Sequence, residues 1–307
     1  MHSGVNINPS AEQWLFQSSI DLVDEALSLA HSNLADSEDA VHRIRVILKV
    51  LRSRQQLIRP FVHPNSYRSA NQRIKSAADE LAGRRDGDVL LKTHAKLLKK
   101  TSGKKTTRSM KALLPLLEQV KETALEPIDW RTVKKRLDAE AVFWKRQTSN
   151  KAFETESPII HGLRLTYSKA RKRFKKAYTE QDRHLFHDWR KWTKYVLFQL
   201  HFLESMGCEK LKKRIQALTK LSKLLGNHHD LHVYRQHIHQ VSAKDFSSDQ
   251  LARCDVRIRQ NEKALENQCK TFARVGFKEK PSQFEAIIRK NWKSTNQLAK
   301  AAGRSAG

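Results

Sequence analysis

The chain has 307 residues, of which 59 are Lys or Arg and 32 are Asp or Glu, so its formal net charge is +27. Such a charge opposes compaction unless an anion relieves it, which predicts a polyanionic partner: nucleic acid, polyphosphate or an anionic membrane. Ten glycines and seven prolines are few for a turn-rich β protein and favour long helices. No stretch reaches the ~18 to 20 apolar residues of a membrane span.

The cysteines and the N-terminus indicate the compartment. Cys208, Cys254 and Cys269 are odd in number and lack the spacing of a disulfide framework, which predicts a reducing environment. The N-terminal MHSGVNINPSAEQ has neither a basic n-region nor an apolar run, so we expect no signal peptide. We therefore predict a soluble cytoplasmic protein without a membrane partner.

Apolar residues recur with helical periodicity through the first half of the chain. This periodicity predicts helices over 11–33, 39–59, 66–82, 83–99, 109–124 and 130–147. The segment KKTSGKKTTR (99–108) is predicted to be an exposed basic loop, and TSNKAFETESP (148–158) a linker.

The second half has a similar layout. Helices are predicted over 159–177, 183–206, 208–225, from LGNHHDLHV (225–233) onward, 248–275 and 281–300. No segment alternates like a strand, so the predicted fold class is all-α. The end of the chain, 291–307, is expected to be a basic helix end and a frayed tail.

A polar pattern occurs once in each half. In the first half, His42 is followed by Arg45 three residues later, by Lys49 seven residues later and by Asp86 44 residues later. The second half has the same order. His187 is followed by Arg190, Lys194 and Asp230 at distances of 3, 7 and 43 residues. The surroundings of the two Asp residues also match, RDGDV (85–89) against HDLHV (229–233). This recurrence predicts an internal duplication.

The cations of the pattern gather on helix faces. His42, Arg45, Lys49 and Arg52 fall within an arc of about 80° on one helix. Two more cationic faces are predicted, made by His187, Arg190, Lys191 and Lys194 and by Arg164, Tyr167, Arg171 and Lys175. Charged runs are often plain solvated faces, but those mix signs at i,i+4. These faces have no acid at i+3 or i+4, which favours a composite anion site, and Arg and Lys both suit phosphate oxygens.

The remaining polar groups have several interpretations. Asp86 and Asp230 are expected to cap the helices that follow them and to orient a neighbouring cation; the alternative is a catalytic carboxylate. A histidine near phosphates can be held protonated and add positive charge. His228 and His232 are spaced i,i+4 like metal ligands, but no further ligand cluster joins them, so we expect no metal and no cofactor. The sequence has no GxxxxGK[ST], GxGxxG or HExxH motif.

Five segments of the chain resemble the CHAD family, the conserved histidine α-helical domain. They are AVHRIRVILKVLRS (40–53), GRRDGDV (83–89), TYSKARKRFKKA (166–177), HDWRKWTK (187–194) and LLGNHHDLHV (224–233). The resemblance implies one domain over 11–290, made of repeats at about 11–147 and 159–290 with the linker 148–158 between them. It also implies two pseudo-symmetric four-helix bundles with a basic pore or channel.

The resemblance further implies binding of inorganic polyphosphate and association with polyphosphate granules. It places on the anion path His42, Arg45, Lys49, Arg52, Arg171, His187, Arg190 and Lys194. To these we add, from the charged faces and the matched Asp segments, Arg85, Arg164, Tyr167, Lys175, Lys191 and His229.

The chain departs from the family pattern at two places. Leu197 and Phe198 stand where the family usually carries Arg-Tyr, and we expect Lys191 to offset the missing cation. Gly83 is three residues before Asp86, whereas Gly226 is four before Asp230. This one-residue deletion is expected to move Arg84 and Arg85. The chain also lacks the ExExK stretch of the triphosphatase domain to which some relatives are fused.

These observations support a non-enzymatic polyphosphate-binding protein. The first alternative is a protein that binds nucleic acid non-specifically, although Tyr167 is the only stacking group on the cationic faces. The second alternative is a metal-dependent phosphohydrolase that uses the histidines with Asp86 and Asp230.

Overall fold

The computed structural model describes residues 11–123, 127–150, 153, 158–180, 183–241 and 246–292. Over these residues it contains helices and no strand, which confirms the all-α prediction. The α-helices are α1 (Ala11–His31), α2 (Glu38–Ile58), α3 (Pro64–Glu80), α4 (Gly83–Lys99), α5 (Lys104–Ala112), α6 (Leu114–Thr123), α7 (Trp130–Gln147), α8 (Pro158–Thr179), α9 (Arg183–Ser205), α10 (Lys212–Val241) and α11 (Ser248–Gly276). The 3-10 turns are η1 (Arg59–Phe61) and η3 (Glu209–Leu211), and a further helix covers 281–292.

The ends of α2 follow from local chemistry. The Ser37 hydroxyl accepts a hydrogen bond from the Ala40 amide at 3.2 Å, and Glu38 and Asp39 place negative charge in the first turn. Pro60 ends the α-helix because it lacks the amide hydrogen that the next helical bond needs. The predicted helix over 39–59 is therefore confirmed to within a residue at each end.

Three predicted boundaries are wrong. The helix predicted over 109–124 is divided between α5, which ends at Ala112, and α6, which begins at Leu114. The basic segment 99–108 is not all loop, because α5 begins at Lys104 after a turn at Gly103 with φ 94°. The predicted break before LGNHHDLHV does not occur, and α10 runs unbroken through Gly226. A glycine inside a helix costs only about 1 kcal/mol relative to alanine, and buried residues continue at helical spacing on both sides of it. The tail beyond 292 lies outside the described residues.

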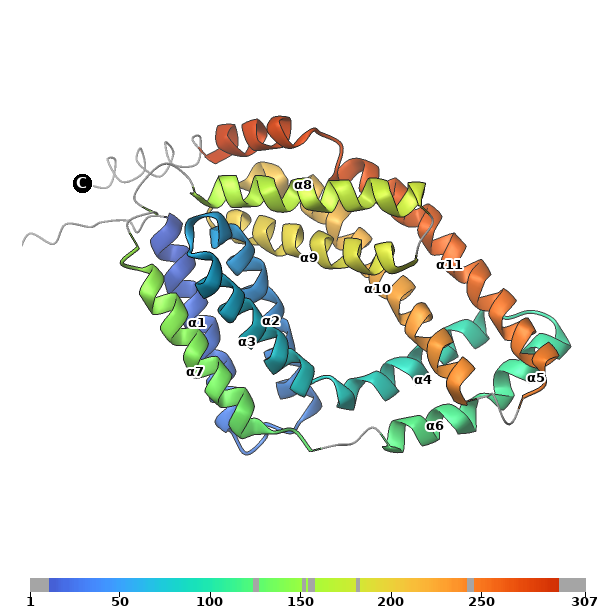
Figure 1. Cartoon of the computed structure of the whole chain (residues 1–307). Coiled ribbons are helices and arrows are strands. Elements are labelled where there is room, and N and C mark those ends of the chain that lie inside the picture. The colour runs from blue at the N-terminus through green and yellow to red at the C-terminus, as the bar shows by residue number, and fades with distance from the viewer. Residues whose placement is uncertain are drawn as a thin grey trace, which may run out of the picture.

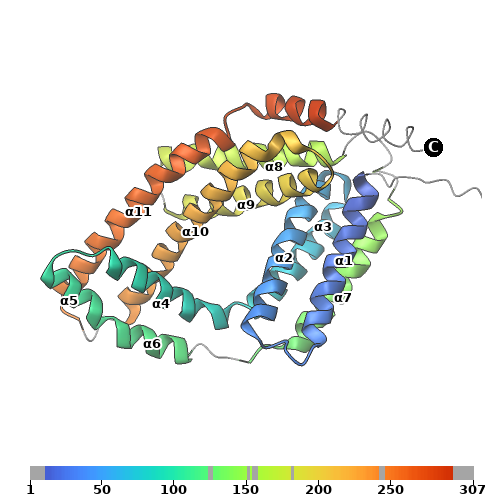
Figure 2. The ribbon, with the colours of Figure 1, turned by 180° about the vertical axis from the view of Figure 1, so that it is seen from behind.

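The helices share two hydrophobic cores. The larger core joins α1, α2, α3 and α7 to α8, α9, the first half of α10 and the last part of α11. The smaller core is formed by α4, α5 and α6 with the second half of α10 and the first half of α11. Figures 1 and 2 show α4 and α5 lying against these two long helices, while α6 packs against α4. The segment 83–123 thus buries its apolar face against the second half of the chain, so 11–147 does not close a core by itself.

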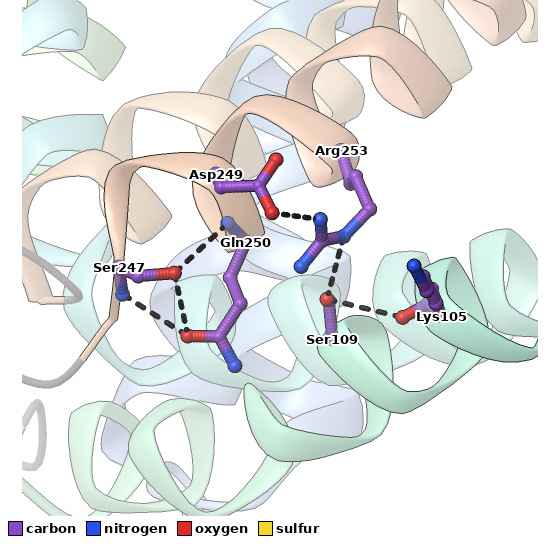
Figure 3. A network of polar contacts seen from close by, with 6 residues as sticks. All are labelled: Lys105, Ser109, Ser247, Asp249, Gln250 and Arg253. Carbon is purple, nitrogen blue, oxygen red and sulfur yellow. Dashed lines mark hydrogen bonds and ion pairs between the residues drawn. The ribbon is translucent and has the colours of Figure 1, made fainter.

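Side-chain hydrogen bonds hold α5 against α11 (Figure 3). Arg253 of α11 donates from Nε to the Ser109 hydroxyl at 3.4 Å, and Ser109 donates to the Lys105 carbonyl at 3.1 Å. At the start of α11, Ser247 and Gln250 form a reciprocal capping box. The bond between Arg253 and Ser109 joins segments that are 144 residues apart in the sequence.

Close packing holds α2 against α8 and α9. The Ser53 hydroxyl donates to the Tyr195 carbonyl at 3.0 Å, and the Gln199 amide donates to the Ser53 carbonyl at 2.9 Å. Gly162 of α8 faces the α2 backbone so closely that a Cβ atom there would lie 1.9 Å from the Leu57 carbonyl oxygen. Only a glycine allows this approach, which sets the position of α2 relative to α8.

Within the described part of the chain, no helix has both the length and the apolar character required to cross a membrane.

Two glycines offer a matched test of this packing. A Cβ at Gly162 meets backbone, so Gly162→Ala should lower the free energy of unfolding by about 2 to 3 kcal/mol. A Cβ at Gly226 meets nothing within 4 Å, so Gly226→Ala should raise it by up to about 1 kcal/mol, since alanine favours the helix. Urea denaturation measures both; effects of the same sign would contradict the proposed close approach of α8 to α2.

Candidate anion-binding site

A cavity of about 530 Å³ lies where α2, α4, α9 and α10 meet. Its lining residues are Arg45 and Lys49 from α2, Val89 from α4, Arg190, Lys194 and Leu197 from α9, and Thr219, Ser222, Lys223, Gly226, Asn227, His229, Asp230 and Val233 from α10. The structure thus brings the Arg and Lys of both sequence motifs to one cavity.

The α2 cations lie beside a buried stripe on the same helix. Ile44 and Leu48 are almost fully buried, and they anchor the flank that carries Arg45 and Lys49. The Arg45 guanidinium also donates from Nη1 to the Leu81 carbonyl at the end of α3. This bond fixes the Arg45 side chain at the point where the chain turns into α4.

The α9 cations are supported in the same way. Trp189 is fully buried and stacks on Phe174 with ring centroids 5.2 Å apart. Thr193 and Val196 are also buried, so α9 cannot rotate, and Arg190 and Lys194 face the cavity. Trp189 and Trp192 of this segment are both core residues.

Sequence reasoning missed most of the wall formed by α10. Thr219, Ser222 and Asn227 are uncharged, and no charge pattern marks them. Lys223 could have been found, because it lies seven residues before Asp230 and therefore on the same helix face. Together these side chains add hydrogen-bonding groups and one more cation.

Cations outnumber acids on the described cavity wall. Its charged side chains are Arg45, Lys49, Arg190, Lys194, Lys223 and Asp230. Asp230 was expected to cap a helix, but it lies inside α10, so that expectation is wrong. Asp86 lies in the first turn of α4, while the side chains of Arg85 and Asp86 are outside the described part of the structure.

Two histidines join α9 to α10 beside this cavity, and of the two only His229 belongs to its described wall. The Nδ1 atoms of His187 and His229 are 3.2 Å apart, within hydrogen-bonding distance. Burial and the charge of Arg190 lower the pKa of His187 and lower that of His229 to about 3. Both pKa values lie below 6.5, so both rings are neutral at pH 7 in the free protein. His42 is exposed on α2 and is not part of the described cavity wall.

The predicted cationic face of α8 does not reach the cavity. Arg164 pairs with Glu285 at 3.1 Å, and Arg171 donates from Nε to the Phe277 carbonyl at 3.2 Å. Tyr167 is fully buried, stacks on Phe284 at 3.9 Å and donates to the Glu279 carbonyl at 2.9 Å. These contacts hold residues 277–285 against α8.

Arg164, Tyr167 and Arg171 are therefore not part of the described cavity wall, and their polar groups bond elsewhere in the chain. Lys175 is exposed on the same helix, away from the cavity wall.

Two more predicted residues lie outside the cavity wall. Arg52 donates to the Asn71 side chain at 3.0 Å, and Lys191 pairs with Asp188 at 2.8 Å. Lys191 therefore does not take the place of the missing cation at Leu197, which contributes an apolar surface to the cavity.

The histidine-rich segment of α10 forms ordinary side-chain contacts. His228 lies 3.5 Å from Glu266 of α11 and stacks on Phe186. In the part of the chain that the structure describes, no group of three or more His, Cys, Asp or Glu side chains is arranged to hold a metal ion.

The structure defines an all-α protein with a cavity lined by cations, and the comparisons with known proteins agree with this fold class. A model of the CHAD domain matches residues 22–239, so the chain belongs to the CHAD family. The structure is similar to the crystal structure of the CHAD domain from the plant Ricinus communis, with a TM-score of 0.52 and 17% identity over 86% of this chain and 89% of that one. At this identity the likeness shows the fold alone. A sequence search of curated proteins gives no match.

The histidine pair predicts how stability depends on pH. Above pH 6.5 His229 is neutral in both states; below it, the unfolded chain binds a proton that the folded protein resists. The free energy of unfolding should therefore fall between pH 7 and pH 5, with about 2 kcal/mol of the loss due to His229. The variant His229→Gln should lose correspondingly less in urea denaturation at the two pH values. An equal loss in both proteins would contradict the lowered pKa.

Proposed function

We propose that the protein binds inorganic polyphosphate through this cavity and catalyses no reaction on it. The observation that carries the proposal is the convergence of Arg45 and Lys49 with Arg190 and Lys194, two copies of one motif, on a single cavity. Arg offers a planar fork of donors and Lys a mobile point charge, and both bind phosphate oxygens. Membership of the CHAD family independently suggests a polyanionic ligand.

The chemistry of the cavity wall supports polyphosphate over nucleic acid. Polyphosphate is a chain of charged phosphates without bases, so cations and hydroxyl groups suffice to bind it. Single-stranded nucleic acids are usually held by aromatic rings that stack on their bases. The described cavity wall has no Phe, Tyr or Trp side chain, and its His229 ring packs against the His187 ring. Tyr167, the one stacking candidate from the sequence, is buried.

The metal-dependent phosphohydrolase is supported less well than either binding function. It needs a metal to activate water, and the described residues offer no cluster of suitable ligands. Asp230 lies among several cations, an arrangement that also orients a neighbouring Arg or Lys. We further propose that the protein associates with polyphosphate granules in the cytoplasm, as the family resemblance implies.

Competition between polyanions tests the choice of ligand. At about 0.15 M salt, where weak surface attraction is screened, long-chain polyphosphate should bind more tightly than single-stranded RNA or duplex DNA. Its affinity should fall steeply with salt, because binding releases counterions. Fluorescence anisotropy with labelled competitors measures the three affinities, and equal values would contradict the proposal.

A charge-matched pair of variants tests the location of the site. Replacing Arg45, Lys49, Arg190 and Lys194 by Ala should weaken polyphosphate binding by about 100-fold or more, because four phosphate contacts are lost. The control replaces four exposed lysines outside the cavity, Lys111, Lys135, Lys145 and Lys278, and removes the same charge. If isothermal titration calorimetry finds the same loss in both variants, binding depends on net charge rather than on the cavity.

A further inference from the structure

A hollow of about 520 Å³ lies between α3 and α7, two helices that pack against each other (Figures 1 and 2). This volume is within the range of small-molecule sites, about 300 to 1,000 Å³. None of its described lining residues also lines the cationic cavity, which is formed by α2, α4, α9 and α10. The α3–α7 hollow is therefore a separate candidate site.

Side chains at helical spacing form the two walls of this hollow. On α3 they include Ser66, Ser69 and Arg73, at i, i+3 and i+7, and on α7 they include Val142 and Arg146, at i and i+4. Residues at these spacings share one face of a helix. Seven residues of a helix span about 10 Å, so the hollow is elongated along the helix axes, with one guanidinium on each wall.

Buried neighbours hold the Arg73 guanidinium in place. Its Nη2 lies 3.6 Å from Oε2 of Glu140, a fully buried carboxyl group whose Oε1 accepts a hydrogen bond from Gln55 at 2.7 Å. The guanidinium also lies 6.0 Å from the centroid of the Phe143 ring. Its Nε is buried and has no acceptor among the described residues. Arg73 is therefore fixed at the wall and has N–H donors left for a ligand.

The charge balance of the hollow is positive. Its described wall carries the guanidiniums of Arg73 and Arg146 and no carboxylate. The acid behind Arg73 is Glu140, and burial raises its pKa to about 7 against the opposing effects of Gln55 and Arg73, so this carboxyl group is only partly ionised at neutral pH. Two guanidiniums and at most one carboxylate leave a net charge between +1 and +2, which suits a singly charged anion.

An apolar surface lies beside the two guanidiniums. Val142 is 48% exposed, one of the large hydrophobic side chains that the described structure leaves in water, and Ala139 and Phe143 line the same wall. An inorganic anion would leave Val142 exposed, whereas an anion with a hydrocarbon body would cover it and gain the free energy of burial. The combination of fixed cations with an apolar strip therefore favours an organic anion over a bare phosphate chain.

We propose that the α3–α7 hollow binds a small carboxylic acid as its anion, with the carboxylate held by Arg73 and Arg146 and the hydrocarbon part lying on Val142. A carboxylate has two oxygens that accept several hydrogen bonds, so one head group can serve both guanidinium forks. The hydroxyl groups of Ser66 and Ser69 on the opposite wall add donors at the same level. This site does not depend on the proposed polyphosphate function.

The test compares octanoate with octanol, which has the same chain and a neutral head group, by ligand-observed NMR titration of the full chain. Octanoate should bind saturably and about 10-fold more tightly than octanol, because only its head group forms charge-assisted hydrogen bonds. Arg146→Ala should remove this advantage and leave the octanol affinity unchanged. Val142→Ser should weaken both ligands by about 3-fold, because both lose apolar contact.

Two matched controls make the outcome decisive. Lys145→Ala removes the same charge from the neighbouring exposed position of α7, which is not on the described wall of the hollow, and Val256→Ser removes an exposed valine from α11. Both controls should bind octanoate with the wild-type affinity. An equal loss in Arg146→Ala and Lys145→Ala would overturn the proposal, since octanoate would then respond to net charge alone. All four replaced side chains are exposed, so each variant should fold.

Other outcomes also decide the question. Wild-type protein that shows no saturable binding of octanoate, or that binds octanol equally well, would overturn the proposal. Much tighter binding of octyl phosphate than of octanoate would overturn the carboxylate in favour of a phosphate ester. Saturating tripolyphosphate should leave octanoate bound, and its displacement would place octanoate in the cationic cavity and overturn the separate site. None of these results depends on whether the protein binds polyphosphate.

Discussion

The structure depends on holding two cationic helix faces together against their mutual repulsion. Two unit charges about 6 Å apart repel by roughly 1 to 3 kcal/mol, depending on the effective dielectric constant. The opposing term is the burial of apolar side chains, worth about 1.5 to 3 kcal/mol each. Behind its cations α2 alone buries Ile44, Ile47, Leu48 and Leu51, each at most 1% exposed. Packing therefore outweighs repulsion, and the cavity stays cationic.

The cavity lies where the two hydrophobic cores meet. Leu218, Leu221 and Leu225 of α10 belong to the larger core, and Leu231 and Tyr234 belong to the smaller one. Between them, residues 226–230 belong to neither core, and most of them line the cavity. The unbroken helix thus spans both cores and presents polar groups at their boundary. A segment rich in histidine therefore occurs inside a long helix that packs in both cores.

Much of the fold could be predicted from the sequence because helices leave a periodic signal. The repeated His, Arg and Lys spacing also indicated which cations belong together, and Arg45, Lys49, Arg190 and Lys194 do line one cavity. Whether the two halves form pseudo-symmetric bundles around a pore stays a prediction, because α4, α5 and α6 pack across the halves.

The rest of the site could not be read from the sequence. Charge spacing shows which side chains share a helix face but not what that face meets in space. The cations of α8 meet Glu285 and backbone carbonyls more than a hundred residues away, and Lys191 meets Asp188 at i−3. The lowered pKa of His229 arises from burial against a neighbouring helix, which periodicity does not reveal.

A crystal structure of the protein with a short polyphosphate tests the central claim most directly. We expect phosphates within hydrogen-bonding distance of side chains from α2 and from α9 in the same cavity. Phosphates bound only at surfaces away from this cavity would contradict the account, because the two cationic faces would then not share a ligand.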